Sequence, residues 1–372
     1  MRKGKGIALL PIGVFLVLYL GLGILFEYVM EIPMGFYNVP IVVAFLAAIL
    51  VACLQNRALD FDKKLEIMAQ GVGDKNIITM LLIFLAAGSF VGVVGRSSAE
   101  SVAYCMLSLI PARFSVAVLF VVACFVSVAM GTSVGTITLL TPIAAAVSTA
   151  SGFDLAFCVA SVMGGAMFGD NLSMISDTTI AATKTQGCEM KDKFKINFKV
   201  ILPAAILVIV IYTFLGSGAN TSVGQYDYNF IKIIPYLGIL IAALIGANVI
   251  AILSGGIVLA GAIGFFTGSL DLKTFFTSIS TGIGGMSELI LISIIIGGIV
   301  EIIKENGGID YVLNLVTKRI NGKKGAEFGI GLLVSLVDAC TANNTIAIVT
   351  VGPLAKDISD EYNLIQKELQ EY

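Results

Sequence analysis

Apolar stretches follow one another along almost the whole chain, and this pattern limits what it can fold into. Of its 372 residues, 57% are hydrophobic and only 13% are charged, about half the charged fraction of an ordinary soluble domain (~25%). So few charged side chains cannot cover a compact core of this size. A membrane-spanning helix needs about 20 mostly apolar residues, so the sequence predicts an all-α, polytopic membrane protein in a lipid bilayer.

The charge and the reactive residues exclude several other classes. The net charge is −2 and the pI about 5.3, so the chain lacks the basic footprint of a nucleic-acid-binding protein. It has no histidine, and its six cysteines are scattered without a Cys-x-x-Cys pair, which argues against a disulfide scaffold or a transition-metal site. No pattern indicates covalent catalysis, so we expect neither an enzyme nor a bound cofactor.

Hydropathy predicts about ten to twelve membrane segments. The ten clearest are Ile7–Phe26, Val39–Leu54, Asn76–Gly95, Phe114–Met130, Phe153–Phe168, Val200–Leu215, Phe230–Ala247, Val249–Gly268, Leu289–Ile303 and Phe328–Val337. Two further apolar stretches, Thr136–Ala150 and Ile346–Ala355, are short for a span. The first run is long for a signal peptide and has no obvious cleavage site, so we expect a retained helix.

Lysine and arginine concentrate on one predicted side of the membrane. With the N-terminus in the cytoplasm, four cytoplasmic groups hold 17 of the 23 basic residues, which fits the positive-inside rule. The groups are Arg2, Lys3 and Lys5; Arg57, Lys63, Lys64 and Lys75; Lys184, Lys191, Lys193, Lys195 and Lys199; and Lys304, Lys318, Arg319, Lys323 and Lys324.

The chain also matches itself, without gaps, at an offset of 211 residues. The matches are Leu59-Asp60 with Leu270-Asp271, Gly71-Val72-Gly73 with Gly282-Ile283-Gly284, and Pro142-Ile143-Ala144 with Pro353-Leu354-Ala355. One register holds over some 85 residues. The sequence therefore predicts two repeats, residues 1–216 and 217–372.

The charge distribution predicts that the repeats face opposite ways. The loop 56–75 is basic, whereas its partner 269–285 carries one lysine; the loop 96–113 is poor in basic residues, whereas its partner 304–325 has five. Inverted repeats of this kind are typical of secondary transporters. The second repeat is expected to be cut short, since the first continues well past Pro142.

A polar segment interrupts the apolar pattern between residues 164 and 179. Two carboxylates, an amide and four hydroxyls lie within ten residues, after glycines 164, 165 and 169, which are expected to weaken the preceding helix. Such oxygens can replace the water shell of a small hard cation such as Na⁺. The candidate ligands of Na⁺ are Asp170, Asn171, Ser173 and Asp177, and the candidate site also includes Ser176 and Thr178.

A second type of polar cluster occurs once in each repeat. Residues 130–136 and 341–347 are short, uncharged and rich in hydroxyl or amide groups. Paired interruptions at corresponding points of two halves point to a binding site near the bilayer midplane. The candidate residues are Thr132, Ser133, Asn343, Asn344 and Thr345, with Asp338 one helical turn before Thr341.

Structural explanations of these clusters remain open. The segment 170–179 would also suit a helix end at the membrane interface, with Asp170 and Asn171 as caps. Glycine, serine and threonine in 130–136 are also favoured where membrane helices pack closely. The second explanation does not account for Asn343-Asn344.

Three motifs resemble a known family. The run GGAMFGDNLSMISDTTIAATKTQGCEMKDKFKINF (Gly164–Phe198) resembles the NhaC-type sodium/proton antiporters of prokaryotes, in the ion transporter superfamily. GTSVGT (Gly131–Thr136) and TANNTIAIVTVGPLAK (Thr341–Lys356) are similar to that family's other two polar motifs. The resemblance covers essentially the whole chain, although the chain ends soon after the last motif, where the family continues. Whether the shortened chain transports by itself stays open.

The resemblance implies an inverted-repeat fold with discontinuous helices or re-entrant hairpins, in a prokaryotic cytoplasmic membrane. It also implies cation-coupled transport, and the expected function is exchange of Na⁺ for H⁺ at a shared carboxylate. The alternative is a cation-coupled permease for an amino acid, such as histidine, or an organic acid. An ion channel is disfavoured, since no charged pore ring is present. A homodimer is left open.

Overall fold

The computed structural model describes residues 4–33, 35–173, 176–216, 227–245, 247–317, 322–341, 344–362 and 364. These residues form helices joined by short connections, with no strand among them, so the all-α prediction is confirmed. The first half contains η1 (Gly6–Leu9), α1 (Leu10–Ile24), η2 (Leu25–Val29), η3 (Gly35–Asn38), α2 (Ile41–Leu54), α3 (Phe61–Val72), α4 (Lys75–Val94), α5 (Arg96–Leu109), η4 (Ala112–Phe114), α6 (Ser115–Met130), α7 (Ser133–Ser151), α8 (Leu155–Leu172), α9 (Asp177–Gln186) and α10 (Met190–Leu215). The second half contains α11 (Phe230–Leu244), α12 (Val249–Phe266), α13 (Leu272–Gly285), α14 (Ser287–Glu305), α15 (Gly308–Thr317), α16 (Gly322–Thr341) and α17 (Asn344–Tyr362).

Several of these helices can cross a membrane. Within the described ranges, six are long and apolar enough, or up to eight if each bent pair of helices forms one span. The bent pairs are α5 with α6, at 113°, and α13 with α14, at 47°. The count is below the ten to twelve segments expected, because apolar helices such as α2 and α11 have only 14 and 15 residues.

One expected short stretch proves to be a long helix. Residues 136–150 belong to α7, which runs for 19 residues from Ser133 to Ser151. Its threonines lower the hydropathy of the stretch. However, the hydroxyls of Thr136, Thr138 and Thr141 each donate to the backbone carbonyl four residues earlier, at 2.6–2.8 Å. Because these bonds satisfy the hydroxyls within the helix, the polar residues do not interrupt it.

Helix boundaries recur at the offset seen in the sequence. Moving α3, α4, α6 and α7 forward by 211 residues places them on α13, α14, α16 and α17 to within a few residues at each end. The aligned aspartates begin equivalent helices: Asp60 caps α3 by accepting from the Lys63 N–H at 2.8 Å, and Asp271 caps α13 by accepting from the Thr274 N–H at 2.7 Å. The Thr274 bonds also hold the pKa of Asp271 below its usual range.

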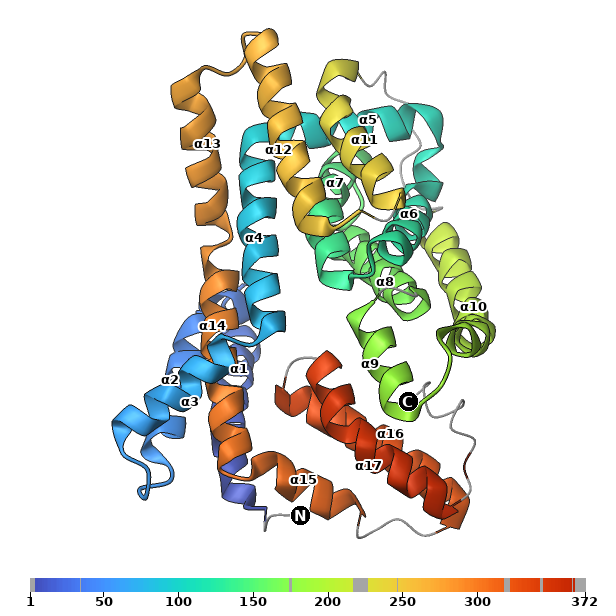
Figure 1. Ribbon diagram of the computed structural model, residues 1–372. Coiled ribbons are helices and arrows are strands. Elements are labelled where there is room, and N and C mark those ends of the chain that lie inside the picture. The colour runs from blue at the N-terminus through green and yellow to red at the C-terminus, as the bar shows by residue number, and fades with distance from the viewer. Residues whose placement is uncertain are drawn as a thin grey trace.

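The matched helices cross in a reciprocal arrangement (Figure 1). α4 packs on α13 while α3 packs on α14, and in Figure 1 α4 rises through the view while α13 and α14 descend. The aligned glycines Gly71 and Gly282 lie at these two crossings. A Cβ at Gly71 would overlap the carbonyl oxygen of Gly297, and one at Gly282 would overlap that of Gly88. Glycine therefore allows both crossings to be close.

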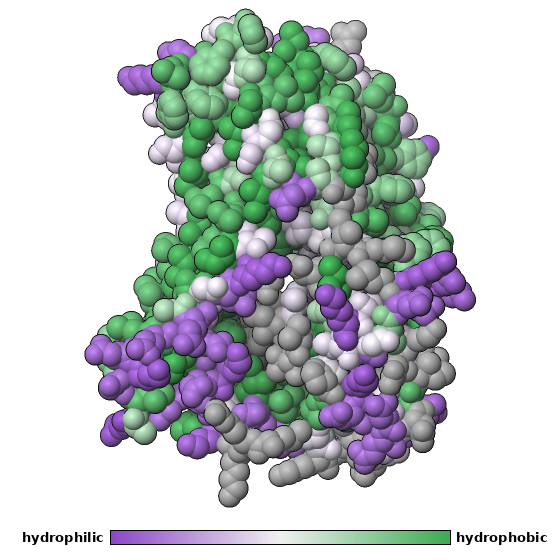
Figure 2. Space-filling view, in the orientation of Figure 1, coloured by the Kyte–Doolittle hydropathy of each residue, from purple (hydrophilic) through white to green (hydrophobic). Residues whose placement is uncertain are grey.

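Polar and apolar surfaces separate along the molecule. Figure 2 shows hydrophilic side chains over the lower part of the view, around α3, and hydrophobic side chains over most of the upper part. The N-terminal end, α3 and α15 lie at the lower end in Figure 1, and α5 and the α12–α13 connection at the upper end. The basic groups expected on one side thus gather at one end.

Two lysines assigned to loops by the sequence are not at the surface. Lys64 is 7% exposed and donates to the carbonyl oxygen of Cys53, near the end of α2, at 2.7 Å. Lys193 is 4% exposed. Counting Lys193 as a loop charge was wrong, because the first turns of α10 turn this side chain into the protein.

Candidate functional site

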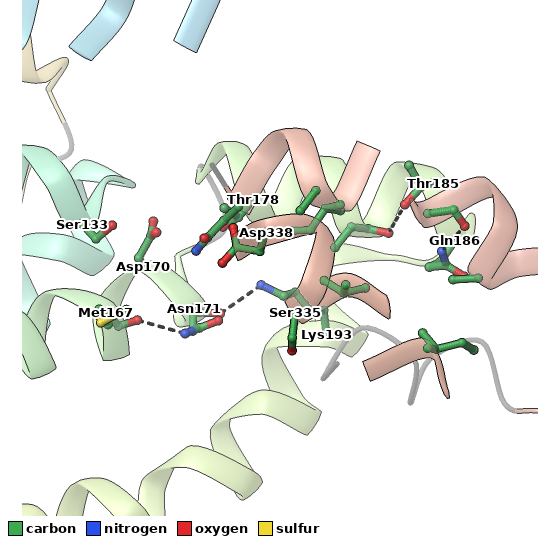
Figure 3. Close-up of a pocket in the computed structure, with 18 residues that line it drawn as sticks. Ser133, Met167, Asp170, Asn171, Thr178, Thr185, Gln186, Lys193, Ser335 and Asp338 are labelled. Carbon is green, nitrogen blue, oxygen red and sulfur yellow. Dashed lines mark hydrogen bonds between the residues drawn. The ribbon is translucent and has the colours of Figure 1, made fainter. Parts of the chain in front are cut away.

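A cavity of about 260 Å³ lies where the end of α8, α9 and the start of α10 meet α16 and α17 (Figure 3). The N-terminus of α7 also reaches it. All three polar motifs of the sequence contribute to its wall. The lining residues are Ser133, Met167, Asp170, Asn171, Thr178, Ala182, Thr185, Gln186, Lys193, Ile330, Val334, Ser335, Asp338, Asn344, Ala347, Ile348, Gly352 and Ala355.

Three helix breaks bring polar backbone ends to this region. α6 ends at Gly131, which has a φ of +66°, and Thr132 caps α7 by accepting from the Gly135 N–H at 3.3 Å. The break between α8 and α9 follows Leu172, and α17 begins at Asn344, three residues after the end of α16. Helix termini present unpaired N–H or C=O groups, so the breaks supply polar partners for a small ligand. The predicted discontinuous helices are confirmed.

Two carboxylates face the cavity from different helices. Asp170 lies in the last turn of α8, and Asp338 lies in α16. In the view of Figure 3, the Asp170 carboxylate lies between Ser133 and Asp338. With its nitrogen turned toward Asp338, the Asn344 amide donates to both carboxylate oxygens, at 2.7 and 3.1 Å. Asp338 is thereby tied to the start of α17.

The position of Asp170 is fixed by the close packing of α8 on α6. A Cβ at Gly165 would overlap the carbonyl oxygen of Phe120, and one at Gly169 would overlap that of Cys124. At the same contact, the Ser127 hydroxyl donates to the carbonyl oxygen of Ala166 at 2.6 Å. The expectation that these glycines weaken the helix was wrong: α8 is continuous to Leu172, and the glycines serve interhelical packing.

Gly169→Ala is therefore expected to lower the melting temperature and the yield of folded protein, because its methyl group would push α8 away from α6. Overpacking of this kind costs about 1–3 kcal/mol. The matched control is Gly164→Ala in the same helix, where a Cβ would meet its nearest neighbour at an ordinary 3.5 Å. Thermal unfolding in detergent measures both. Equal stability of the two variants would contradict the close contact.

Lys193 is the cavity residue whose role the sequence did not reveal. Its ammonium donates to the backbone carbonyl oxygen of Asn171 at 3.1 Å and to the Thr179 hydroxyl at 2.6 Å. Asn197, one turn later on α10, donates to the same carbonyl oxygen at 3.3 Å. Burying an ammonium costs several kcal/mol unless it is paired. The only signal in the sequence is the Lys193–Asn197 spacing of four, which places both residues on one helix face.

At the other end of the cavity, α9 closes on α17. The Gln186 amide nitrogen donates to the carbonyl oxygen of Gly352 at 2.9 Å, and both residues are buried. A Cβ at Gly352 would press on Thr185. This contact joins segments 166 residues apart and seals that side of the cavity. The sequence indicated no role for Thr185, Gln186 or Ser335.

The structure brings half of the predicted site residues into the cavity wall: Ser133, Asp170, Asn171, Thr178, Asp338 and Asn344. Thr132, Ser173, Ser176 and Thr345 lie outside the lining; Ser173 and Ser176 are each 1% exposed, and the Ser176 hydroxyl bonds that of Thr178 at 2.8 Å. Asn343 and the side chain of Asp177 lie outside the described part of the chain. Among the described residues, no three His, Cys, Asp or Glu side chains cluster to hold a metal ion.

The chain is similar to known transporters over most of its length. The model of the Na⁺/H⁺ antiporter family matches residues 8–217 and 227–370. The chain belongs to the Na⁺/H⁺ antiporter family. It is therefore related to integral membrane transporters rather than to enzymes, and the family resemblance seen in the three motifs is confirmed.

Curated relatives in this family are distant but extensive. The Na⁺/H⁺ antiporter NhaC of Bacillus subtilis (strain 168) is 25% identical, over 86% of this chain and 78% of the relative. NhaC of Alkalihalophilus pseudofirmus is 24% identical, over 71% and 64%. The malate-2H⁺/Na⁺-lactate antiporter of Bacillus subtilis is 22% identical, over 97% and 82%.

Proposed function

We propose that the chain exchanges Na⁺ for H⁺ and that both ions bind, in turn, to the Asp170 carboxylate in the cavity. The observation that carries this proposal is the meeting of all three polar motifs around Asp170. The names of the NhaC relatives support the choice of ions.

The chemistry follows from the charge of one carboxylate. A bound proton removes the negative charge that attracts Na⁺, and bound Na⁺ disfavours protonation. The two ions therefore compete for Asp170. Oxygen atoms of Asn171, Ser133 and Thr178 line the same cavity and could replace part of the water shell of Na⁺. Asp338 supplies a second carboxylate, and Asp177 stays a candidate from its place in the motif.

We further propose that the repeats 1–216 and 217–372 are inserted in opposite directions. Their relative rocking would open the cavity to each side of the membrane in turn. The recurring helix boundaries and the reciprocal crossings at Gly71 and Gly282 support this arrangement. The gathering of basic groups at the end with the N-terminus supports a cytoplasmic N-terminus.

Purified chain in liposomes tests this function. An outward Na⁺ gradient is expected to acidify the lumen, read with a pH-sensitive dye, because Na⁺ leaving must be exchanged for H⁺ entering. Choline in place of Na⁺ serves as the control for passive leaks. No Na⁺-dependent change of lumenal pH in liposomes that contain folded protein would refute the proposal.

Exchange of a small organic acid is a second candidate, favoured by the size of the cavity. About 260 Å³ is several times the roughly 30 Å³ that one water molecule occupies in the liquid, so a molecule larger than Na⁺ fits. The name of the malate–lactate relative points the same way. Adding malate, lactate or amino acids to the liposome assay separates the candidates: pH changes that require one of them would favour this function over simple Na⁺/H⁺ exchange.

A further inference from the structure

Lys193 connects the two sides of the helix break that ends the Asp170 helix. It enters from α10, and its ammonium donates both to Asn171 in the last turn of α8 and to Thr179 in the first turn of α9. The side chain is 4% exposed and lines the cavity. Figure 3 shows its bond to Asn171 beside Asp170.

The atoms around this ammonium are those that a metal cation would use. A carbonyl oxygen in the last turn of a helix lacks an intrahelical donor, and carbonyl and hydroxyl oxygens are typical ligands of hard cations. The Asn197 side chain adds another oxygen, which is buried and has no hydrogen-bond partner within the described part of the chain. The Lys193 ammonium thus takes the place of a cation at the break.

The charges of the cavity wall make this lysine more than a structural support. Asp170 lies one residue before Asn171 and attracts the ammonium electrostatically. Among the described residues of the wall, Lys193 is the one cation, and Asp170 and Asp338 are the two carboxylates. The ammonium therefore offsets part of the negative charge that any incoming cation must use.

We propose that Lys193 is the built-in competitor of the transported cation: its ammonium neutralises Asp170 until a cation enters the cavity and takes over that carboxylate. The inference rests on the proposed function of the same site and adds a residue that sets its affinity for cations. Its consequence is that the protein binds Na⁺ more weakly than its carboxylates alone would, which keeps the ion exchangeable.

Substitutions that keep the shape of Lys193 but remove its charge test this role. In Lys193→Gln the amide can still donate to Asn171 or Thr179, and Lys193→Met keeps the length of the side chain without a charge. Both variants are expected to bind Na⁺ more tightly, with half-saturation at a Na⁺ concentration on the order of tenfold lower, because a positive charge close to the bound cation is gone. Loss of a merely structural residue would weaken binding instead.

The measurement is the Na⁺-dependent rise in melting temperature of the purified full chain, titrated with NaCl against choline chloride at constant ionic strength. Lys193→Arg keeps the charge and is expected to resemble the wild type. The matched control is Lys195→Gln, since Lys195 lies two residues further along α10 and is exposed. It is expected to leave the Na⁺ dependence unchanged.

The outcomes separate this inference from the proposed function. A wild-type chain that does not respond to Na⁺ refutes the proposed function, and the inference with it. A wild type that responds, together with Lys193→Gln that responds at the same or higher Na⁺ concentration, overturns the inference alone. Failure of both neutral variants to fold also overturns it, because the lysine would then be a structural element of the helix break.

Discussion

Asp170→Asn is expected to reduce Na⁺-driven proton movement in liposomes to the level of protein-free liposomes. Asparagine has nearly the same shape, so the packing of α8 through Gly165 and Gly169 is retained. Its neutral amide, however, neither carries a proton near neutral pH nor attracts Na⁺ as a carboxylate does. With both competing ions unable to bind at this position, exchange stops while the fold persists.

The matched control for this variant is Asp154→Asn at the opposite end of the same helix. Asp154 caps α8 by accepting from the Phe157 N–H at 3.2 Å, and asparagine caps a helix about as well as aspartate. Full exchange is therefore expected. Asp338→Asn and Asp177→Asn belong in the same series. Wild-type exchange by Asp170→Asn, with loss in either of the others, would move the shared carboxylate to that residue.

Much of the fold is written in local features of the sequence. Runs of apolar residues with few charges predict membrane helices, and the glycine at 131 and the polar residues after 341 predict the breaks between α6 and α7 and between α16 and α17. The offset of 211 residues between Asp60 and Asp271 anticipates two equivalent helix starts. Each of these features depends on residues close together in the chain, so a single sequence reveals them.

The site was less predictable because it depends on contacts between distant segments. Lys193 stands in a run of charged residues that is typical of a cytoplasmic loop, yet the first turns of α10 carry it into the cavity wall. Gln186 meets Gly352 across 166 residues. Nothing in the composition around either residue distinguishes it from its exposed neighbours. Only packing selects which polar residue is buried.

The two repeats use equivalent helix faces differently. On α6, Cys124 and Ser127 pack against α8, and Ser127 bonds its backbone. The residues 211 positions later are Ser335 and Asp338 on α16, and both line the cavity. One copy of this face supports the Asp170 helix, and the other copy supplies the opposite wall with a second carboxylate. The divergence of the repeats thus creates the asymmetry of the site.

Gly282→Leu is expected to abolish monodisperse, folded protein on size exclusion in detergent. Its first side-chain atom would already overlap the carbonyl oxygen of Gly88 on α4, and a backbone atom cannot move aside as a side chain can. The cost should exceed the roughly 1–3 kcal/mol of an overpacked core, a large part of a typical stability of about 5–15 kcal/mol. Gly71→Leu, at the reciprocal crossing against Gly297, is expected to fail in the same way.

Gly284→Leu, two residues along the same helix, is the matched control. A Cβ there meets no atom within 4 Å, and leucine favours helix more than glycine does. The variant should fold and exchange Na⁺ like the wild type. If Gly282→Leu folded equally well, α4 and α13 could not be in backbone contact, and the crossing that we propose as the rocking surface between the repeats would be wrong. If Gly71→Leu alone folded, the two crossings would not be equivalent, and the inverted-repeat proposal would lose its structural support.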